Sequence, residues 1–258
     1  MLNFRNTNIV FVLLLLALLL SDLFCEVPVP VYLLLTFLYS LVLFYGSYFI
    51  RLQFFMKAIC KAKRAEKKIA ITFDDGPLKH YTPEILQILK TNNIKATFFC
   101  IGKNAAAHKD VLAEMLKQGH IIGSHSYSHG FWFDLLSAKN MQKDLEQAHA
   151  VFNDVLGINI KWFRPPYGVT NPNLKKAVEK MGYTAIGWSV RSLDTLAKDE
   201  RALMHKLKKN LTAGSIFLFH DTVAITLKVL PGFIAYTRQM GFEIVSLDKL
   251  IHLQPYAD

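Results

Sequence analysis

The chain has 258 residues and a formal net charge of +10, and it is 52% hydrophobic and 19% charged. This composition excludes a disordered chain, because disordered chains are poor in apolar residues and rich in charged ones. Three cysteines, Cys25, Cys60 and Cys100, exclude a disulfide-stapled scaffold, so the length predicts one domain of ordinary size plus an accessory segment.

Two apolar runs open the chain. Residues 9–20 are apolar without interruption, and residues 31–50 contain no charged side chain. A helix needs about 20 apolar residues to cross a bilayer core, and neither run has the polar stripe of a core helix. No A-x-A-like cleavage site follows the first run, which argues against a removed signal peptide. We therefore expect residues 1–52 to form a transmembrane helical hairpin in the inner or plasma membrane.

Basic residues are concentrated just after the second run, mainly in a predicted juxtamembrane linker at residues 53–67. They are Arg51, Lys57, Lys61, Lys63, Arg64, Lys67 and Lys68. The turn between the two runs has Asp22 and Glu26 and no basic residue, so the positive-inside rule favours the cytoplasmic side for both chain ends. The cluster predicts contact with anionic lipid, although a solvated linker explains the same charges. Nothing in the charge pattern indicates nucleic acid, and no protein partner is indicated.

The remainder, residues 68–258, alternates strand-like and helix-like segments. Strands are predicted over residues 69–73, 94–101, 120–124, 160–163, 184–190, 215–219 and 241–247. Helices are predicted over residues 82–92, 104–117, 137–156, 172–181, 198–211 and 222–240, the last of them interrupted at Pro231-Gly232. This alternation is typical of an α/β domain with a parallel sheet. About 190 residues are few for an eight-fold barrel, so we expect an incomplete barrel of about seven units.

Chemically capable residues follow five of the predicted strands. They are Asp74 and Asp75, His125 and His129, Arg164, Asp194, and His220. Each has an ordinary explanation alone, such as an Asp-Gly-Pro turn, a surface histidine pair or a hydrogen-bonded core histidine. The carboxyl ends of parallel strands meet at one edge, however, and that edge is where α/β enzymes have their sites.

His125, His129 and one of the neighbouring aspartates also form a ligand set that suits a catalytic metal. Residues i and i+4 share one face of a helical turn, which would place His125 beside His129. Two imidazoles and one carboxylate leave positions open for water and substrate, as catalytic rather than structural zinc sites do.

Four motifs resemble those of the NodB-type polysaccharide deacetylases, carbohydrate esterase family 4. They are Thr72-Phe73-Asp74-Asp75-Gly76-Pro77, His125-Ser126-Tyr127-Ser128-His129, Arg164-Pro165-Pro166-Tyr167-Gly168 and Leu218-Phe219-His220. The resemblance covers about residues 66–250. A further family motif, Asp-x-x-Asp-Trp, is altered here, because Arg191 replaces the first Asp and Thr195 replaces the Trp.

The resemblance implies a distorted (β/α)7 barrel and a hydrolase of non-peptide carbon–nitrogen bonds. The implied reaction is metal-dependent removal of an N-acetyl group from an N-acetylglucosamine-type sugar of a polysaccharide or oligosaccharide, with release of acetate. The implied cofactor is a divalent metal, Zn²⁺ with Co²⁺ or Ni²⁺ as alternatives.

Each site residue receives a role from the resemblance. Asp75, His125 and His129 would bind the metal. Asp74 would be the general base and His220 the general acid, with Arg164 holding Asp74 and Asp194 orienting His220. The backbone N–H of Tyr167 would help to hold the oxyanion, and Pro166 and Trp188 would line the substrate site.

Two other functions remain open from the sequence. A barrel on the cytoplasmic side could not reach mature wall polymer, so a lipid-linked acetylated or formylated amino sugar is an alternative substrate. A membrane-tethered sugar-binding module that holds a metal without catalysis is the other alternative. Asp74 and His220 argue against it, since binding alone needs neither.

Overall fold

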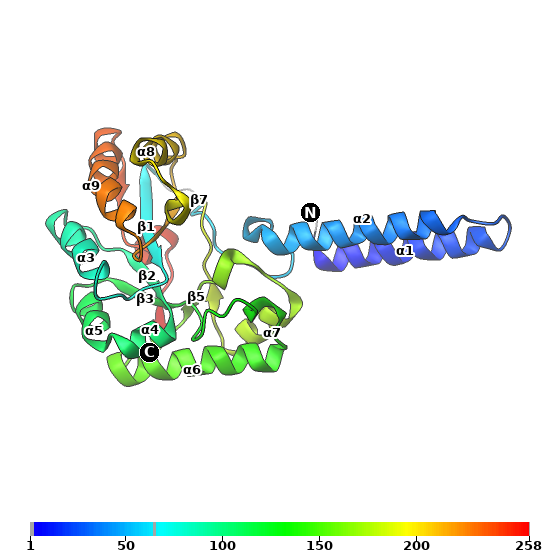
Figure 1. Ribbon diagram of the computed structural model, residues 1–258, viewed down its shortest axis with the longest axis horizontal. Helices are drawn as coiled ribbons and strands as arrows, with labels where there is room; N and C mark the ends of the chain where they lie inside the picture. The colour runs from blue at the N-terminus through cyan, green and yellow to red at the C-terminus, as the bar shows by residue number, and fades with distance from the viewer. Residues whose placement is uncertain (1–2, 64–65, 258) are drawn as a thin grey trace.

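The computed structural model describes residues 3–63 and 66–257. Arg64 of the predicted linker, with its neighbour Ala65, and the chain ends at residues 1–2 and 258 lie outside the described residues. Helices α1 (Phe4–Asp22) and α2 (Val29–Tyr48) form a long hairpin that projects from an α/β domain (Figure 1).

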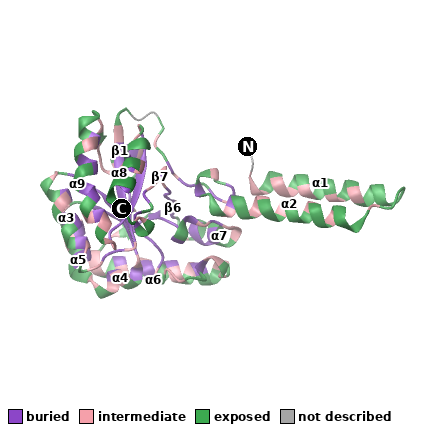
Figure 2. Cartoon of the chain, turned by 45° about the horizontal axis from the view of Figure 1, so that its top comes forward, coloured by how far each residue is buried: buried purple, intermediate pink, exposed green. Residues whose placement is uncertain are grey.

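The hairpin helices are apolar on all sides and packed against each other. Phe11 stacks on Tyr39 with ring centroids 4.1 Å apart, and the Tyr39 hydroxyl donates a 2.9 Å hydrogen bond to Oδ1 of Asn8. Both helices are long and apolar enough to cross a membrane, and only 6% of each apolar window is buried. Figure 2 shows this exposure along the hairpin, in contrast to the buried interior of the α/β domain.

The α/β domain contains ten strands and eight further helices among the described residues. The strands are β1 (Lys68–Asp74), β2 (Thr97–Cys100), β3 (Ile121–Ser124), β4 (Asn159–Ile160), β5 (Trp162–Phe163), β6 (Thr184–Ala185), β7 (Val190–Arg191), β8 (Ile216–His220), β9 (Glu243–Ile244) and β10 (Tyr256–Ala257). The helices are α3 (Thr82–Thr91), α4 (Gly102–Ala107), α5 (Lys109–Lys117), α6 (Ala138–Leu156), α7 (Pro172–Lys180), α8 (Glu200–Lys209), α9 (Ala224–Gln239) and α10 (Leu247–Ile251). Short 3₁₀ turns cover Phe133–Leu135, Pro166–Gly168 and Asp194–Leu196.

The parallel sheet has the order β6-β5-β3-β2-β1-β8-β7, and β9 pairs with the start of β1. One chain segment, 184–191, supplies both edges of this sheet. Ile186 N–H donates to Phe163 O at one edge, and Ser189 N–H donates to Ile216 O at the other. The sheet therefore curls round on itself, and the predicted distorted (β/α)7 barrel is confirmed.

Strand alternation places one apolar cluster between the sheet and its helices. Inside the barrel it places a second apolar cluster, which includes Ala70, Phe99 and Ile216, together with polar side chains toward the carboxyl ends of the strands. Ile71 and Phe73 of β1 face the helices in the main hydrophobic core, where Phe73 stacks on Phe98 at 4.9 Å. Successive side chains of a strand point to opposite faces, so Thr72 and Asp74 point inward. The inward-facing polar side chains of β1 thereby lie toward the carboxyl end of the barrel, where Asp74 ends the strand.

Several element boundaries differ from the sequence predictions. The helix predicted at residues 104–117 is two helices separated at His108, whose backbone is not helical. The strands predicted at residues 160–163 and 184–190 are each divided in two. The predicted interruption at Pro231 is wrong, because α9 continues through it. Leu230, Phe233 and Ile234 are fully buried around that proline, and this packing outweighs a helix penalty of roughly 3 kcal/mol.

The predicted linker at residues 53–67 is largely built into the barrel. Phe54, Met56, Ala58 and Cys60 are buried, and Ile59 N–H donates to Ala185 O at 2.9 Å. The end of α2 is also fixed, because Ser47 and Thr170 exchange hydrogen bonds of 2.7 and 3.0 Å. The hairpin is therefore held against the barrel through packed and hydrogen-bonded contacts.

Candidate active site

Asp75, His125 and His129 converge at the carboxyl ends of β1 and β3. Nε2 of His125 lies 3.5 Å from Oδ1 of Asp75, and Nε2 of His129 lies 3.4 Å from the same oxygen. Potential ligand atoms of the three residues all lie within 4.8 Å of one another. Ligands about 2.0–2.2 Å from a tetrahedral ion are themselves roughly 3.3–3.6 Å apart, so this spacing fits one divalent ion.

The histidine pair lies in a loop, and the expected helical turn is not formed. Ser126 and His129 have φ values of 63° and 45°, which a helix does not permit. Asp144 of α6 holds the loop by accepting hydrogen bonds from the N–H groups of Tyr127 and Ser128, at 2.7 and 3.1 Å. The two imidazoles thus share one side because of a loop fixed from α6.

The surroundings of the triad also suit a metal. Oδ1 of Asp75 is buried and accepts no hydrogen bond from a described residue. Burial opposes the charge of Asp75, but the nearby imidazoles of His125, His129 and His220 lower its pKa overall. Burial and the neighbouring His125 lower the pKa of His129 to about 4, so its imidazole is neutral at pH 7. Nδ1 of His125 lies 2.7 Å from the Arg164 carbonyl, and a hydrogen bond there leaves Nε2 as the ligand nitrogen.

Asp74 is held in place by a fully buried arginine. Nη1 of Arg164 donates to Oδ1 of Asp74 at 2.7 Å and to Oγ1 of Thr72 at 2.8 Å. Its Nε and Nη2 donate to the carbonyls of Ile186 and Gly187. The other carboxylate oxygen, Oδ2 of Asp74, lies 3.9 Å from Nε2 of His125 and faces the triad.

His220 faces the same point from β8. Its Nδ1 lies 2.7 Å from Oδ1 of Asp194, and its Nε2 lies 3.9 Å from Oδ2 of Asp75. Burial lowers the pKa of His220, but the hydrogen bond and charge of Asp194 outweigh burial and raise it. Burial likewise opposes the charge of Asp194, while His220 lowers its pKa overall.

The three residues predicted to contact substrate have different surroundings. Tyr167 is 41% exposed, and its ring lies 4.7 Å from that of His129. Pro166 is buried in the same 3₁₀ turn. Trp188 packs against Gly168, where any Cβ would collide with the indole, so Trp188 supports the turn that carries Tyr167.

Two supporting residues were not assigned from the sequence. Asp221 is fully buried beside Gly76, accepts a 2.6 Å hydrogen bond from Thr82, and has its pKa raised to about 7 by burial. Thr226 donates to Oδ2 of Asp194 at 2.7 Å. Asp221 directly follows His220, so its position beside the motif was a signal, whereas nothing local marked Thr226.

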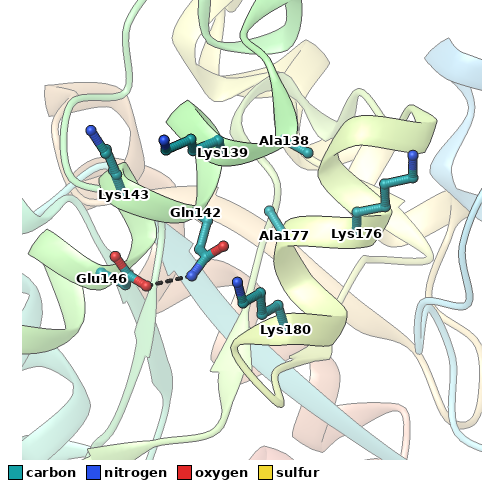
Figure 3. Close-up of a pocket in the computed structure, with 8 residues that line it drawn as sticks. All are labelled: Ala138, Lys139, Gln142, Lys143, Glu146, Lys176, Ala177 and Lys180. Carbon is teal, nitrogen blue, oxygen red and sulfur yellow. Dashed lines mark hydrogen bonds between the residues drawn. The ribbon is translucent and has the colours of Figure 1, made fainter.

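Two grooves on the surface contain none of the residues that converge at this site. One of about 430 Å³ lies between α6 and α7 and is lined by Lys139, Lys143, Lys176 and Lys180 (Figure 3). The other lies where the hairpin meets the barrel.

Comparisons with known proteins show the family of this chain. Residues 61–186 match the family described as Polysaccharide deacetylase. The chain is 35% identical over 190 residues to the peptidoglycan-N-acetylglucosamine deacetylase PgdA of Listeria monocytogenes, covering 74% of this chain but only 40% of that protein. It is 31% identical over 201 residues to a peptidoglycan-N-acetylglucosamine deacetylase of Bacillus cereus, covering 72% of this chain and 89% of that protein.

A solved structure agrees with these matches. The crystal structure of the Bc1960 peptidoglycan N-acetylglucosamine deacetylase superimposes with a TM-score of 0.73 at 27% identity, covering 78% of this chain and 95% of the other.

Proposed function

This chain belongs to the polysaccharide deacetylase family, and on that premise we propose that it hydrolyses the N-acetyl group of an amino sugar and releases acetate. The observation that carries the proposal is the convergence of Asp75, His125 and His129 on one point that Asp74 and His220 also face. Relatives named as peptidoglycan deacetylases support a polymer of N-acetylglucosamine type as the substrate.

Asp75, His125 and His129 would hold the metal. A divalent ion bound there would polarise the acetyl carbonyl and lower the pKa of the attacking water. One carboxylate and two imidazoles suit Zn²⁺, with Co²⁺ and Ni²⁺ as alternatives.

Asp74 acts as the general base in this proposal. Its Oδ1 is fixed by Arg164 at 2.7 Å, which leaves Oδ2 directed toward the triad. A carboxylate oriented in this way can take a proton from the water while the water oxygen bonds to the acetyl carbon. Arg164 has a positioning role, since its guanidinium donates four hydrogen bonds, one to Asp74 and three to other groups of the barrel interior.

His220 acts as the general acid. Asp194 orients the ring through Nδ1, and Nε2 faces the site. When the carbon–nitrogen bond breaks, Nε2 gives its proton to the departing amine, and the acyl carbon leaves as acetate. The raised pKa of His220 keeps that proton available near neutral pH.

The turn at Pro166–Gly168 is proposed to stabilise the oxyanion. The backbone N–H of Tyr167 would donate to the carbonyl oxygen as its charge develops, and such a donor acts mainly in the transition state. Pro166 and Trp188 shape this turn, and the exposed Tyr167 ring offers a surface to the sugar.

We further propose that the hairpin anchors the enzyme as an integral membrane protein. The charge asymmetry favours the cytoplasmic side for the barrel, and this observation favours a lipid-linked amino sugar as the second candidate substrate. A reporter enzyme fused after Lys68 tests the side directly.

Mass spectrometry of products against a panel of acylated sugars, polymeric and lipid-borne, tests the function. The full chain should remove one acetyl group per reacted sugar, and the D74N variant serves as the inactive control. A chain that binds metal but releases acetate from no substrate would favour the sugar-binding module and refute the proposal.

A further inference from the structure

A groove of about 1320 Å³ lies at the junction of the hairpin and the barrel. Its walls come from the start of α1, residues 53–63, α7 and the end of α10. Phe4 N–H donates to Phe54 O at 3.0 Å, which joins the first helix to the wall. Phe4, Phe55 and Ile59 give the groove a partly apolar lining.

The groove is strongly basic. Six cations line it and one carboxylate, Glu179, accompanies them. The cations are Arg5, Lys57, Lys61, Lys63, Lys175 and Lys176. Oε1 of Glu179 lies 3.7 Å from Nζ of Lys175. Among the described residues, the ion pairs found do not include Lys57, Lys63 or Lys176.

The lysines of residues 57–63 are gathered on one side by strand-like alternation. Met56, Ala58 and Cys60 are buried in the barrel, whereas Lys57 and Lys61 are exposed. Alternate side chains of an extended segment point to opposite faces. Packing of the small and apolar side chains therefore leaves the basic ones on the exposed side of the segment, and both sets of residues line the groove.

The groove lies at the level where the hairpin would enter a bilayer. Arg5 is in the first turn of α1, and the uninterrupted apolar run begins at Ile9. Four residues of helix rise about 6 Å, so Arg5, and the groove that it lines, lie within about one headgroup layer of the apolar run. Basic side chains next to apolar ones complement a phospholipid, in which a phosphate group is joined to acyl chains.

We propose that this groove binds the headgroup phosphate of an anionic phospholipid from the bilayer around the hairpin. The inference takes the hairpin as membrane-spanning and is independent of the proposed deacetylation. Each basic residue near an anionic membrane surface strengthens binding by about fivefold, so removal of three lysines should weaken it by about a hundredfold if their contributions add.

Native mass spectrometry of the full chain in detergent tests the proposal, with phosphatidylglycerol and phosphatidylcholine as probes. The chain should retain phosphatidylglycerol about tenfold more than phosphatidylcholine. The variant K57Q/K63Q/K176Q should lose this preference. The matched control K139Q/K143Q/K180Q removes the same charge from the α6–α7 groove (Figure 3) and should keep it.

Three results would overturn the proposal. They are equal retention of both lipids, an equal loss in the control variant, and displacement of phosphatidylglycerol by equimolar inorganic phosphate, which would indicate a site for free anions.

Thermal unfolding checks that the variants fold. If the triple variant does not, K57Q and K63Q alone should each weaken phosphatidylglycerol binding by about fivefold, and unchanged binding in both would also overturn it.

Discussion

Replacement of Asp194 by Asn tests the proposed acid most sharply. Asp194 accepts three hydrogen bonds of 2.7 Å, from Nδ1 of His220, from the backbone N–H of His220 and from Oγ1 of Thr226. An asparagine offers one acceptor oxygen in place of two and removes the charge. The variant therefore keeps the shape of the site but loses the interaction that raises the pKa of His220.

The size of the effect follows from that interaction. A hydrogen bond to a charged group contributes about 1.5–3 kcal/mol. If the D194N variant loses this stabilisation of protonated His220, acetate release should fall about 10- to 150-fold, because each tenfold change in rate corresponds to about 1.4 kcal/mol. Without Asp194 the pKa of His220 falls, so the loss of kcat at high pH should begin at a lower pH than in the unmodified chain.

The assay is the pH dependence of kcat for acetate release by the full chain, D194N and D199N. Asp199 is the exposed N-cap of α8 and accepts a hydrogen bond from Arg201 N–H. D199N is thus a matched loss of charge five residues away and should leave the profile unchanged. A D194N profile that coincides with that of the unmodified chain would refute the role of Asp194 in orienting and charging His220.

Three further predictions follow from the site and the core. H125A should lose the bound divalent ion and activity together, and metal analysis that finds a full equivalent in the variant would contradict the ligand assignment. D74N should keep the ion while acetate release falls about 10²- to 10⁴-fold, so a single-turnover rate equal to that of the unmodified chain would exclude Asp74 as the base. Burial lowers the pKa of His120 from 6.5 to about 4, so between these values the unfolded chain binds a proton that the folded chain does not. The free energy of unfolding should therefore fall by up to about 3 kcal/mol as the pH falls from 6.5 to 4. Urea unfolding at pH 7 and 4.5 measures this fall, and the H120N variant should lack the part of it that His120 causes. An identical pH dependence in both chains would contradict the assignment to His120.

The barrel and the position of its site could be predicted from the sequence because both depend on local patterns. Buried β-rich runs that end in Asp74, His125 or His220 are visible in the residues, and parallel pairing brings such ends to one edge. The pairing of His125 with His129 was predicted from helical spacing. The structure brings them together by another route, a loop with two positive φ values held by Asp144.

Long-range packing limited the rest of the prediction. Residues 53–63 contain several lysines, and this composition predicted an exposed linker, although Met56, Ala58 and Cys60 are buried at alternate positions. The backbone of Ile59 in this segment pairs with Ala185 and Ile186, which lie more than a hundred residues away. Thr226 likewise meets Asp194 only because α9 packs beside the turn after β7. No local periodicity encodes contacts of this kind.

Acetate release from an N-acetylglucosamine polymer, measured before and after chelation, tests the central claim most directly. The account predicts that the full chain releases acetate, that a chelator abolishes the release, and that added Zn²⁺ or Co²⁺ restores it. Turnover that persists unchanged in a chain shown to be free of metal would contradict the assignment of Asp75, His125 and His129.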